Sequence, residues 1–120
     1  MELEDIKRIL GADVIAGTEL LLEDIKTACG SDLMSDVLSF AKSGSLLLTD
    51  LTNPQVVRTT DMVDLVAICF VRGKKPDRAT IKMAKSKNIL LLVTPLLMFE
   101  SCGRLYRKGL LGCSDYEKEH

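Results

Sequence analysis

The sequence has no tryptophan, three phenylalanines, two tyrosines and a single histidine, His120. Aromatic packing is therefore a minor part of any core, and aliphatic side chains must supply most of the buried apolar surface. The four cysteines form no Cys-x-x-Cys pair. This spacing predicts neither a structural zinc site nor the disulfide framework of a small secreted domain, and no cofactor is implied.

The sequence also lacks an excess of either charge. Lys and Arg number 16 and Asp and Glu 17, which gives a formal net charge of −1 at pH 7. A basic footprint for nucleic acid or anionic lipid is missing, so we expect neither as a partner. The apolar runs fall well short of the roughly 20 residues that span a bilayer. The acidic residues 1–5 differ from a secretory signal, and we expect a cytoplasmic protein.

The chain is long enough for one core but too short for two. It has 120 residues, of which 47% are hydrophobic and 28% charged, a composition typical of globular proteins. We predict a single domain over residues 1–112 and a polar C-terminal tail over residues 113–120.

The second half of the sequence alternates apolar runs with amphipathic segments. The apolar runs predict strands over residues 45–49, 65–71 and 89–93. The amphipathic segments predict helices over residues 55–63, 78–87 and 96–108, with caps at Asn53 and Asp77. This alternation predicts an α/β fold, a small three-layer α/β/α domain with a mostly parallel sheet.

The first half is less regular. A helix is predicted over residues 2–10, ending at Gly11, and a short strand over residues 13–16. We predict an exposed strand over residues 20–28, whose apolar edge Leu20-Leu21-Leu22 favours self-association as a homodimer. A further helix follows, capped by Ser31 or Asp32. Asp32 and Asp36 share a face of it, an arrangement that favours a cap and a solvated surface over an acid and base pair.

The cysteines allow one further hypothesis. Cys69 lies within an apolar run and is predicted to be a small buried residue. Cys29, Cys102 and Cys113 can meet only through tertiary folding, which leaves open a redox or iron–sulfur accessory role.

The predicted topology brings three loops together. The carboxyl ends of parallel strands meet at one edge of a sheet, so residues 50–55, 72–77 and 94–96 should converge there. The helix N-terminus at Asn53 offers backbone N–H groups to an anion, with Arg58 one turn on, although an ordinary cap and a surface arginine fit the pattern equally.

The turn Arg72-Gly73-Lys74-Lys75 lacks the Gly-x-x-x-x-Gly-Lys-[Ser/Thr] pattern of a phosphate loop, so kinase activity is not supported. It is either a solvated basic turn or part of an anion site. We predict that a small anion or nucleotide would contact Asn53, Gln55, Arg58, Arg72, Gly73, Lys74 and Thr94.

Four blocks of the sequence resemble a known family. Residues 30–38, GSDLMSDVL, resemble the G-x-D-L-L-S-x-V-M stretch of DRTGG domains. Residues 52–59, 71–77 and 98–106 extend the likeness over most of the chain. The motif that names the family is poorly matched, since residues 23–28 are EDIKTA.

The resemblance implies a fold similar to the N-terminal domain of HPr kinase/phosphorylase. DRTGG domains occur in phosphotransacetylases, in CBS-domain pyrophosphatases and as small proteins, some encoded near iron-only hydrogenases. They look like regulatory or dimerisation modules, which implies a non-enzymatic protein that binds a small ligand. The alternative is a purely structural interaction module for a separately encoded partner enzyme.

Overall fold

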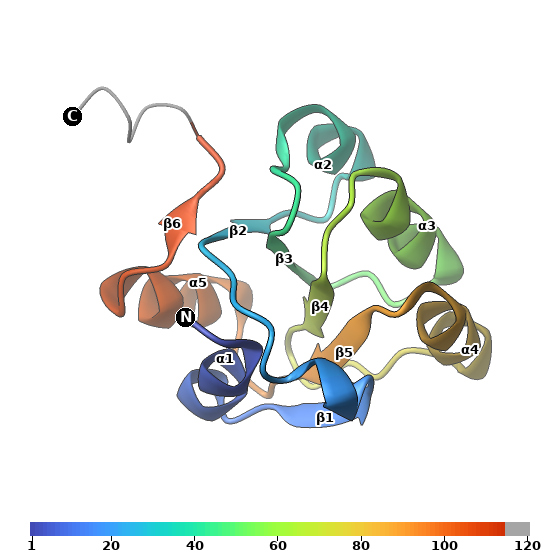
Figure 1. Ribbon diagram of the computed structural model, residues 1–120, viewed down its shortest axis with the longest axis horizontal. Helices are drawn as coiled ribbons and strands as arrows, with labels where there is room; N and C mark the ends of the chain where they lie inside the picture. Colours follow the sequence, from blue (N-terminus) through green and yellow to red (C-terminus); the bar gives the residue numbers. More distant parts are fainter. Residues whose placement is uncertain (115–120) are drawn as a thin grey trace.

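The structure, a computed structural model, describes residues 1–114. Within this part of the chain a single sheet has the strand order β1-β5-β4-β3-β2-β6 (Figure 1). The strands are β1 (Asp13–Ala16), β2 (Thr27–Gly30), β3 (Leu46–Thr49), β4 (Ala67–Phe70), β5 (Leu90–Val93) and β6 (Leu111–Gly112). The helices are α1 (Leu3–Leu10), α2 (Met34–Phe40), α3 (Pro54–Met62), α4 (Arg78–Lys87) and α5 (Met98–Arg107), with a 3₁₀ turn over Thr18–Leu20.

The sheet is mostly parallel. β6, β2, β3, β4 and β5 run in parallel, whereas β1 is antiparallel to β5 at the opposite edge from β6. Helices α1 and α5 cover one face and α2, α3 and α4 cover the other (Figure 1). This arrangement confirms the predicted three-layer α/β/α fold.

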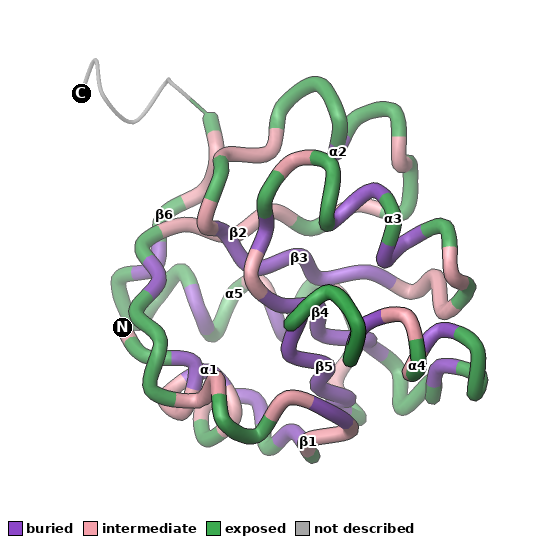
Figure 2. The backbone as a smooth tube through the Cα atoms, turned by 45° about the vertical axis from the view of Figure 1, so that its right-hand side comes forward, coloured by how far each residue is buried: buried purple, intermediate pink, exposed green. Residues whose placement is uncertain are grey.

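The central strands are buried on both faces. Every residue of β3, β4 and β5 is buried, as the purple centre of Figure 2 shows. Alternate side chains enter opposite layers, so Leu46 and Leu48 pack with the α1 and α5 side and Leu47 with the α3 side. Burial on both faces explains why these strands appear in the sequence as continuous apolar runs.

Several helix ends agree with the sequence. α1 ends at Gly11, whose φ of 58° is left-handed. The Asp77 side chain accepts a hydrogen bond from the Thr80 backbone N–H and caps α4, which ends at a left-handed Asn88. These local signals confirm the predicted end of α1 at Gly11 and both predicted bounds of α4.

The prediction of an exposed strand over residues 20–28 is wrong. The 3₁₀ turn and irregular chain precede β2, which begins only at Thr27. The carbonyls of Leu21 and Glu23 accept hydrogen bonds from the Glu4 and Leu3 N–H groups, and Glu2 and Asp24 form an isolated antiparallel bridge. This segment therefore pairs with the start of α1 and does not form a strand of the sheet. Leu20 and Leu21 pack against the core, and Leu22 alone of the three leucines is exposed. The strand edge on which self-association was predicted is not formed.

The predicted cap of α2 is also wrong. α2 begins at Met34, with Leu33 at the N-cap position and no side-chain cap. Ser31 instead accepts a hydrogen bond from the Leu33 backbone N–H within the preceding turn, and Asp32 turns towards β3. The two-residue strand β6 had no sequence signal, because two residues cannot show a period.

The end of the described chain belongs to the fold. Cys113 lies against β2 and accepts a hydrogen bond from the Lys42 backbone N–H at 3.3 Å. The remainder of the predicted tail, residues 115–120, lies outside the described residues. No helix within residues 1–114 is both long enough and apolar enough to cross a membrane.

Candidate functional site

The loops that follow β3 and β4 meet at the carboxyl edge of the sheet. The Arg72 guanidinium donates from Nε and Nη2 to the two carboxylate oxygens of Asp50, each at 2.8 Å. Lys74 Nζ lies 3.5 Å from the same carboxylate. One acidic residue therefore holds two cations side by side, as the convergence of these loops predicts.

The backbone at Arg72 has an unusual conformation. Arg72 and Gly73 both have positive φ values, of 62° and 68°. A non-glycine residue with positive φ is uncommon and is found preferentially at turns and functional sites. The conformation is held by hydrogen bonds from the Arg72 N–H to the Leu96 carbonyl at 2.9 Å and from the Gly73 N–H to the Thr94 carbonyl at 2.8 Å.

Thr94 joins this edge to α1. Its side chain is fully buried, and its hydroxyl donates to the Leu10 carbonyl at 2.7 Å. The Thr94 carbonyl holds Gly73, as described above. Both residues were predicted to contact a ligand, and the Gly73 N–H and the Thr94 hydroxyl each donate to a carbonyl of the protein. Through these bonds Thr94 and Gly73 hold the Arg72 turn and the end of β5 in place against α1.

The N-terminus of α3 lies in the next part of the same edge. Asn53 occupies the N-cap position, but its exposed side chain makes no capping hydrogen bond. Arg58 Nε donates to Gln55 Oε1 at 3.2 Å across one helical turn, and both residues are exposed. Asn53 thus stands at the predicted cap position, but its side chain does not cap the helix. Pro54 has no N–H and the Val56 N–H donates to the Asn53 carbonyl, so Gln55 supplies the backbone donor of the first turn that an anion could use.

Sequence reasoning missed the role of Asp32. Its Oδ1 atom accepts hydrogen bonds from Thr49 Oγ1 at 2.9 Å and from the Asp50 backbone N–H at 2.6 Å. Asp32 thereby links the β2–α2 loop to the end of β3. Its place in a block that resembles DRTGG domains was the available signal, but a helix cap explained the same residue locally.

Charge pairing shifts the acid–base behaviour of this cluster. The hydrogen bonds from Arg72 lower the pKa of Asp50, with smaller contributions from the charges of Arg72 and Lys74. Asp50 in turn raises the pKa of Arg72. The carboxylate stays ionised at neutral pH and keeps both cations in place.

Three of the four cysteines lie on or beside β2. Cys29 lies on β2, and Cys113, which follows β6, donates from its thiol to the Ala28 carbonyl next to it. Burial, followed by the neighbouring Cys113 thiol, raises the pKa of Cys29 to about 12. Burial also raises the pKa of Cys102. Among residues 1–114, no group of three His, Cys, Asp or Glu side chains is arranged to hold a metal ion.

Comparisons with known proteins give a structural likeness but no match in sequence. No protein-family model matches the chain, and no curated protein matches it. The chain is similar in structure to the CBS and DRTGG domains of the regulatory region of a Clostridium perfringens pyrophosphatase, solved in complex with the activator diadenosine tetraphosphate. The TM-score is 0.72 at 19% sequence identity, over 92% of this chain and 47% of that one. This chain thus spans less than half of its neighbour's length, and at this identity the likeness shows the fold alone.

Proposed function

We propose that the protein is a non-catalytic regulatory domain that binds a small anionic ligand, a nucleotide or another phosphate compound, at the carboxyl edge of the sheet. The observation that carries this proposal is the Asp50 carboxylate, which holds Arg72 and Lys74 together beside the loop that enters α3. The ligand would lie against Arg72, Lys74 and the start of α3.

The contacts of Arg72 leave it able to bind a ligand. A guanidinium has five N–H donors, and Arg72 uses Nε and one Nη2 donor to bind Asp50. The other three bind no described residue, and the side chain is 49% exposed. Arginine in such a fixed orientation recognises phosphate or carboxylate oxygens in pairs, at little further entropic cost.

The start of α3 supplies the second half of the proposed site. A helix N-terminus carries a partial positive charge and unpaired N–H groups, both of which favour an anion. Asn53 leaves its amide available, and the Gln55–Arg58 pair holds another guanidinium on the first turns of the helix. The ligands of open α/β sheets commonly bind at this edge.

The structural neighbour supports the kind of ligand proposed. It is the regulatory region of an enzyme, in complex with a nucleotide that activates it. Two adenosines joined by a phosphate chain are an anionic ligand of the class expected here. Since its fold is shared with this chain, a regulatory role is the simplest function to test first.

The test is thermal unfolding of the full chain with a panel of nucleotides, acyl phosphates and simple anions. A ligand at 100 times its Kd stabilises the folded state by about 2.7 kcal/mol. We expect the shift to be lost in Arg72→Ala and reduced in Asn53→Ala. Arg72→Lys keeps the charge but not the paired donors and should give an intermediate shift. Lys85→Ala, an exposed cation in the last turn of α4, is the control, and a shift that survives Arg72→Ala would refute the proposed site.

A second candidate function is an interaction module for a partner protein. The observation that favours it is the exposure of large apolar side chains on and beside α2, with Phe40 at 71% and Leu33 at 57% exposed. An apolar surface of this kind is typical of protein contacts. Phe40→Ser should then disrupt complexes or self-association in sedimentation experiments while Arg72→Ala leaves them intact.

A further inference from the structure

A second basic region lies on the opposite face of the sheet, between α1 and α5. Between these two helices lies a hollow of about 460 Å³ that is open to solvent. It is lined by Arg8, Ile9, Arg104, Arg107 and Lys108. Four of these five residues are cationic, and Arg8, Arg104, Arg107 and Lys108 are all exposed. We refer to this feature as the α1–α5 hollow.

The cations of the α1–α5 hollow are largely unpaired. Arg8 Nη2 pairs with Asp5 Oδ1 at 2.7 Å. Arg104 Nη1 donates to the Ile9 backbone carbonyl at 3.3 Å, a neutral acceptor. Within residues 1–114, Arg104, Arg107 and Lys108 form no ion pair. The hollow thus differs from the carboxyl edge, where Asp50 accompanies both Arg72 and Lys74.

The C-terminal ends of α1 and α5 stabilise the positive charges of this cluster. Arg8 lies in the last turn of α1, and Arg104 and Arg107 lie in the last turn of α5. The partial negative charge at a helix C-terminus stabilises cations in its last turn. The fold can therefore assemble these arginines without a matching set of acidic side chains, which leaves their donors for an external anion.

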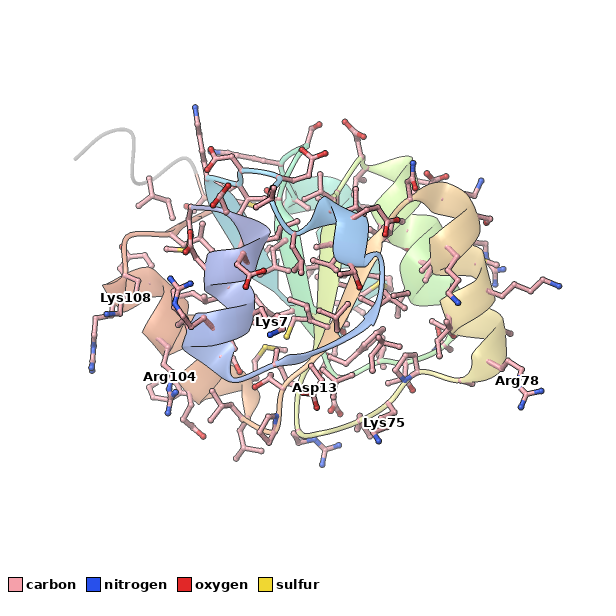
Figure 3. The ribbon with its side chains drawn as sticks, turned by 60° about the horizontal axis from the view of Figure 1, so that its bottom comes forward. Lys7, Asp13, Lys75, Arg78, Arg104 and Lys108 are labelled. Carbon is pink, nitrogen blue, oxygen red and sulfur yellow. The ribbon has the colours of Figure 1, made fainter. Side chains whose placement is uncertain are left out.

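The hollow and the cations near α4 occupy different parts of the surface. Figure 3 shows Arg104 and Lys108 projecting outward from α5 at the left of the view, whereas Lys75 and Arg78 lie at the right. α5 covers the face of the sheet opposite to α3 and α4. A ligand in the hollow would consequently not contact the start of α3.

We propose that the α1–α5 hollow is a binding site for an oligophosphate chain. Its volume of about 460 Å³ is open to solvent, so an extended anionic chain could lie along the cations that line it. Guanidinium groups match the geometry of phosphate oxygens, and several of them can distribute over successive phosphates. None of the five lining residues is aromatic, so the hollow offers no stacking surface for a base. The recognised group is the phosphate chain, whether free or attached to a nucleoside.

The experiment is calorimetric titration of the full chain with inorganic tripolyphosphate at low ionic strength, in the Arg72→Ala background. This background removes the binding that the proposed carboxyl-edge site would contribute. We expect Arg107→Gln/Lys108→Gln to weaken binding roughly tenfold or more, since two charge-assisted contacts are lost. This pair leaves the contact between Arg104 and Ile9 intact. Arg104→Gln/Arg107→Gln should weaken binding at least as much.

Matched controls keep the result specific. Lys82→Gln/Lys85→Gln removes two exposed cations of α4 and should change the affinity less than twofold. ATP should bind within a few-fold of tripolyphosphate, and orthophosphate much more weakly. Equal weakening by the α4 control, no effect of the α5 variants, or equally tight binding of a polyglutamate peptide would each overturn the proposal. Loss of the thermal shift in Arg72→Ala with tripolyphosphate binding retained would separate this site from the carboxyl-edge site.

Discussion

Asp32 accepts a hydrogen bond from the backbone N–H of Asp50 at 2.6 Å, although the two residues are 18 positions apart. The Asp50 side chain in turn holds the guanidinium of Arg72 through two contacts of 2.8 Å. The loops that follow β2, β3 and β4 are therefore joined at the carboxyl edge of the sheet by one chain of polar contacts. Asp32 therefore helps to orient Arg72 through Asp50, although Asp32 and Arg72 share no hydrogen bond.

We expect Asp32→Ala to destabilise the protein by about 1–3 kcal/mol, because it removes the acceptor for the Asp50 N–H and for the buried Thr49 hydroxyl. Asp32→Asn keeps an oxygen in the same place and should lose less than half of that amount. Urea unfolding of both variants measures the difference. Equal destabilisation by Ala and Asn would mean that the charge of Asp32, and not its acceptor geometry, stabilises this edge.

The Asp50–Arg72 pair predicts a specific dependence on pH. The pKa of Asp50 is lowered in the folded state by Arg72, so its contribution to stability is present above the ordinary aspartate pKa of about 3.9. That contribution is lost as the pH falls through the lower, folded pKa. The difference in Tm between wild type and Asp50→Asn should therefore be largest at neutral pH and vanish on acidification. Asp13→Asn, at the exposed start of β1, is the control, and a gap that does not shrink as the pH is lowered would contradict the assignment.

Local sequence signals were sufficient for the central part of the fold. The runs that contain β3, β4 and β5 are apolar on both faces because these strands are covered on both faces. The helix ends at Gly11 and Asn88 follow from the left-handed backbone that a C-terminal cap requires. The convergence of the Asp50 and Arg72 loops then follows from topology alone.

The remaining features depend on contacts between distant segments. Residues 21–23 have the composition of a strand, but their carbonyls accept the N–H groups of Leu3 and Glu4, which no local pattern reveals. Asp32 stands where a helix cap is expected and instead binds the end of β3. The α1–α5 hollow likewise combines residues near both ends of the chain. A pattern within one segment does not contain this information.

A substitution at Gly17 tests how closely the chain before the 3₁₀ turn Thr18–Leu20 packs against β5. Its φ is 89°, and a Cβ atom there would lie 2.9 Å from the Leu90 Cα atom and 3.3 Å from the Ile89 carbonyl oxygen. Left-handed backbone strain of about 1–2 kcal/mol and overpacking of about 1–3 kcal/mol should add in Gly17→Ala. Gly11→Ala is the matched control, since its φ of 58° is also left-handed but nothing lies within 4 Å of the new Cβ. Denaturant unfolding should show a clearly larger loss for Gly17→Ala, and equal losses would mean that β5 adjusts to the extra atom.

The thiols give a direct test of the redox hypothesis. The pKa values of Cys29 and Cys69 are raised to about 12, chiefly by burial. Because the thiolate is the reactive form, both residues should be alkylated by iodoacetamide at pH 8 at least a hundredfold more slowly in the folded protein than in urea. Peptide mass spectrometry over a time course resolves each cysteine separately, and fully buried Cys69 serves as the internal reference. Cys29 reacting as fast in the folded protein as in urea would show that it is accessible and ionised, which would favour a redox role for the cysteines beside β2.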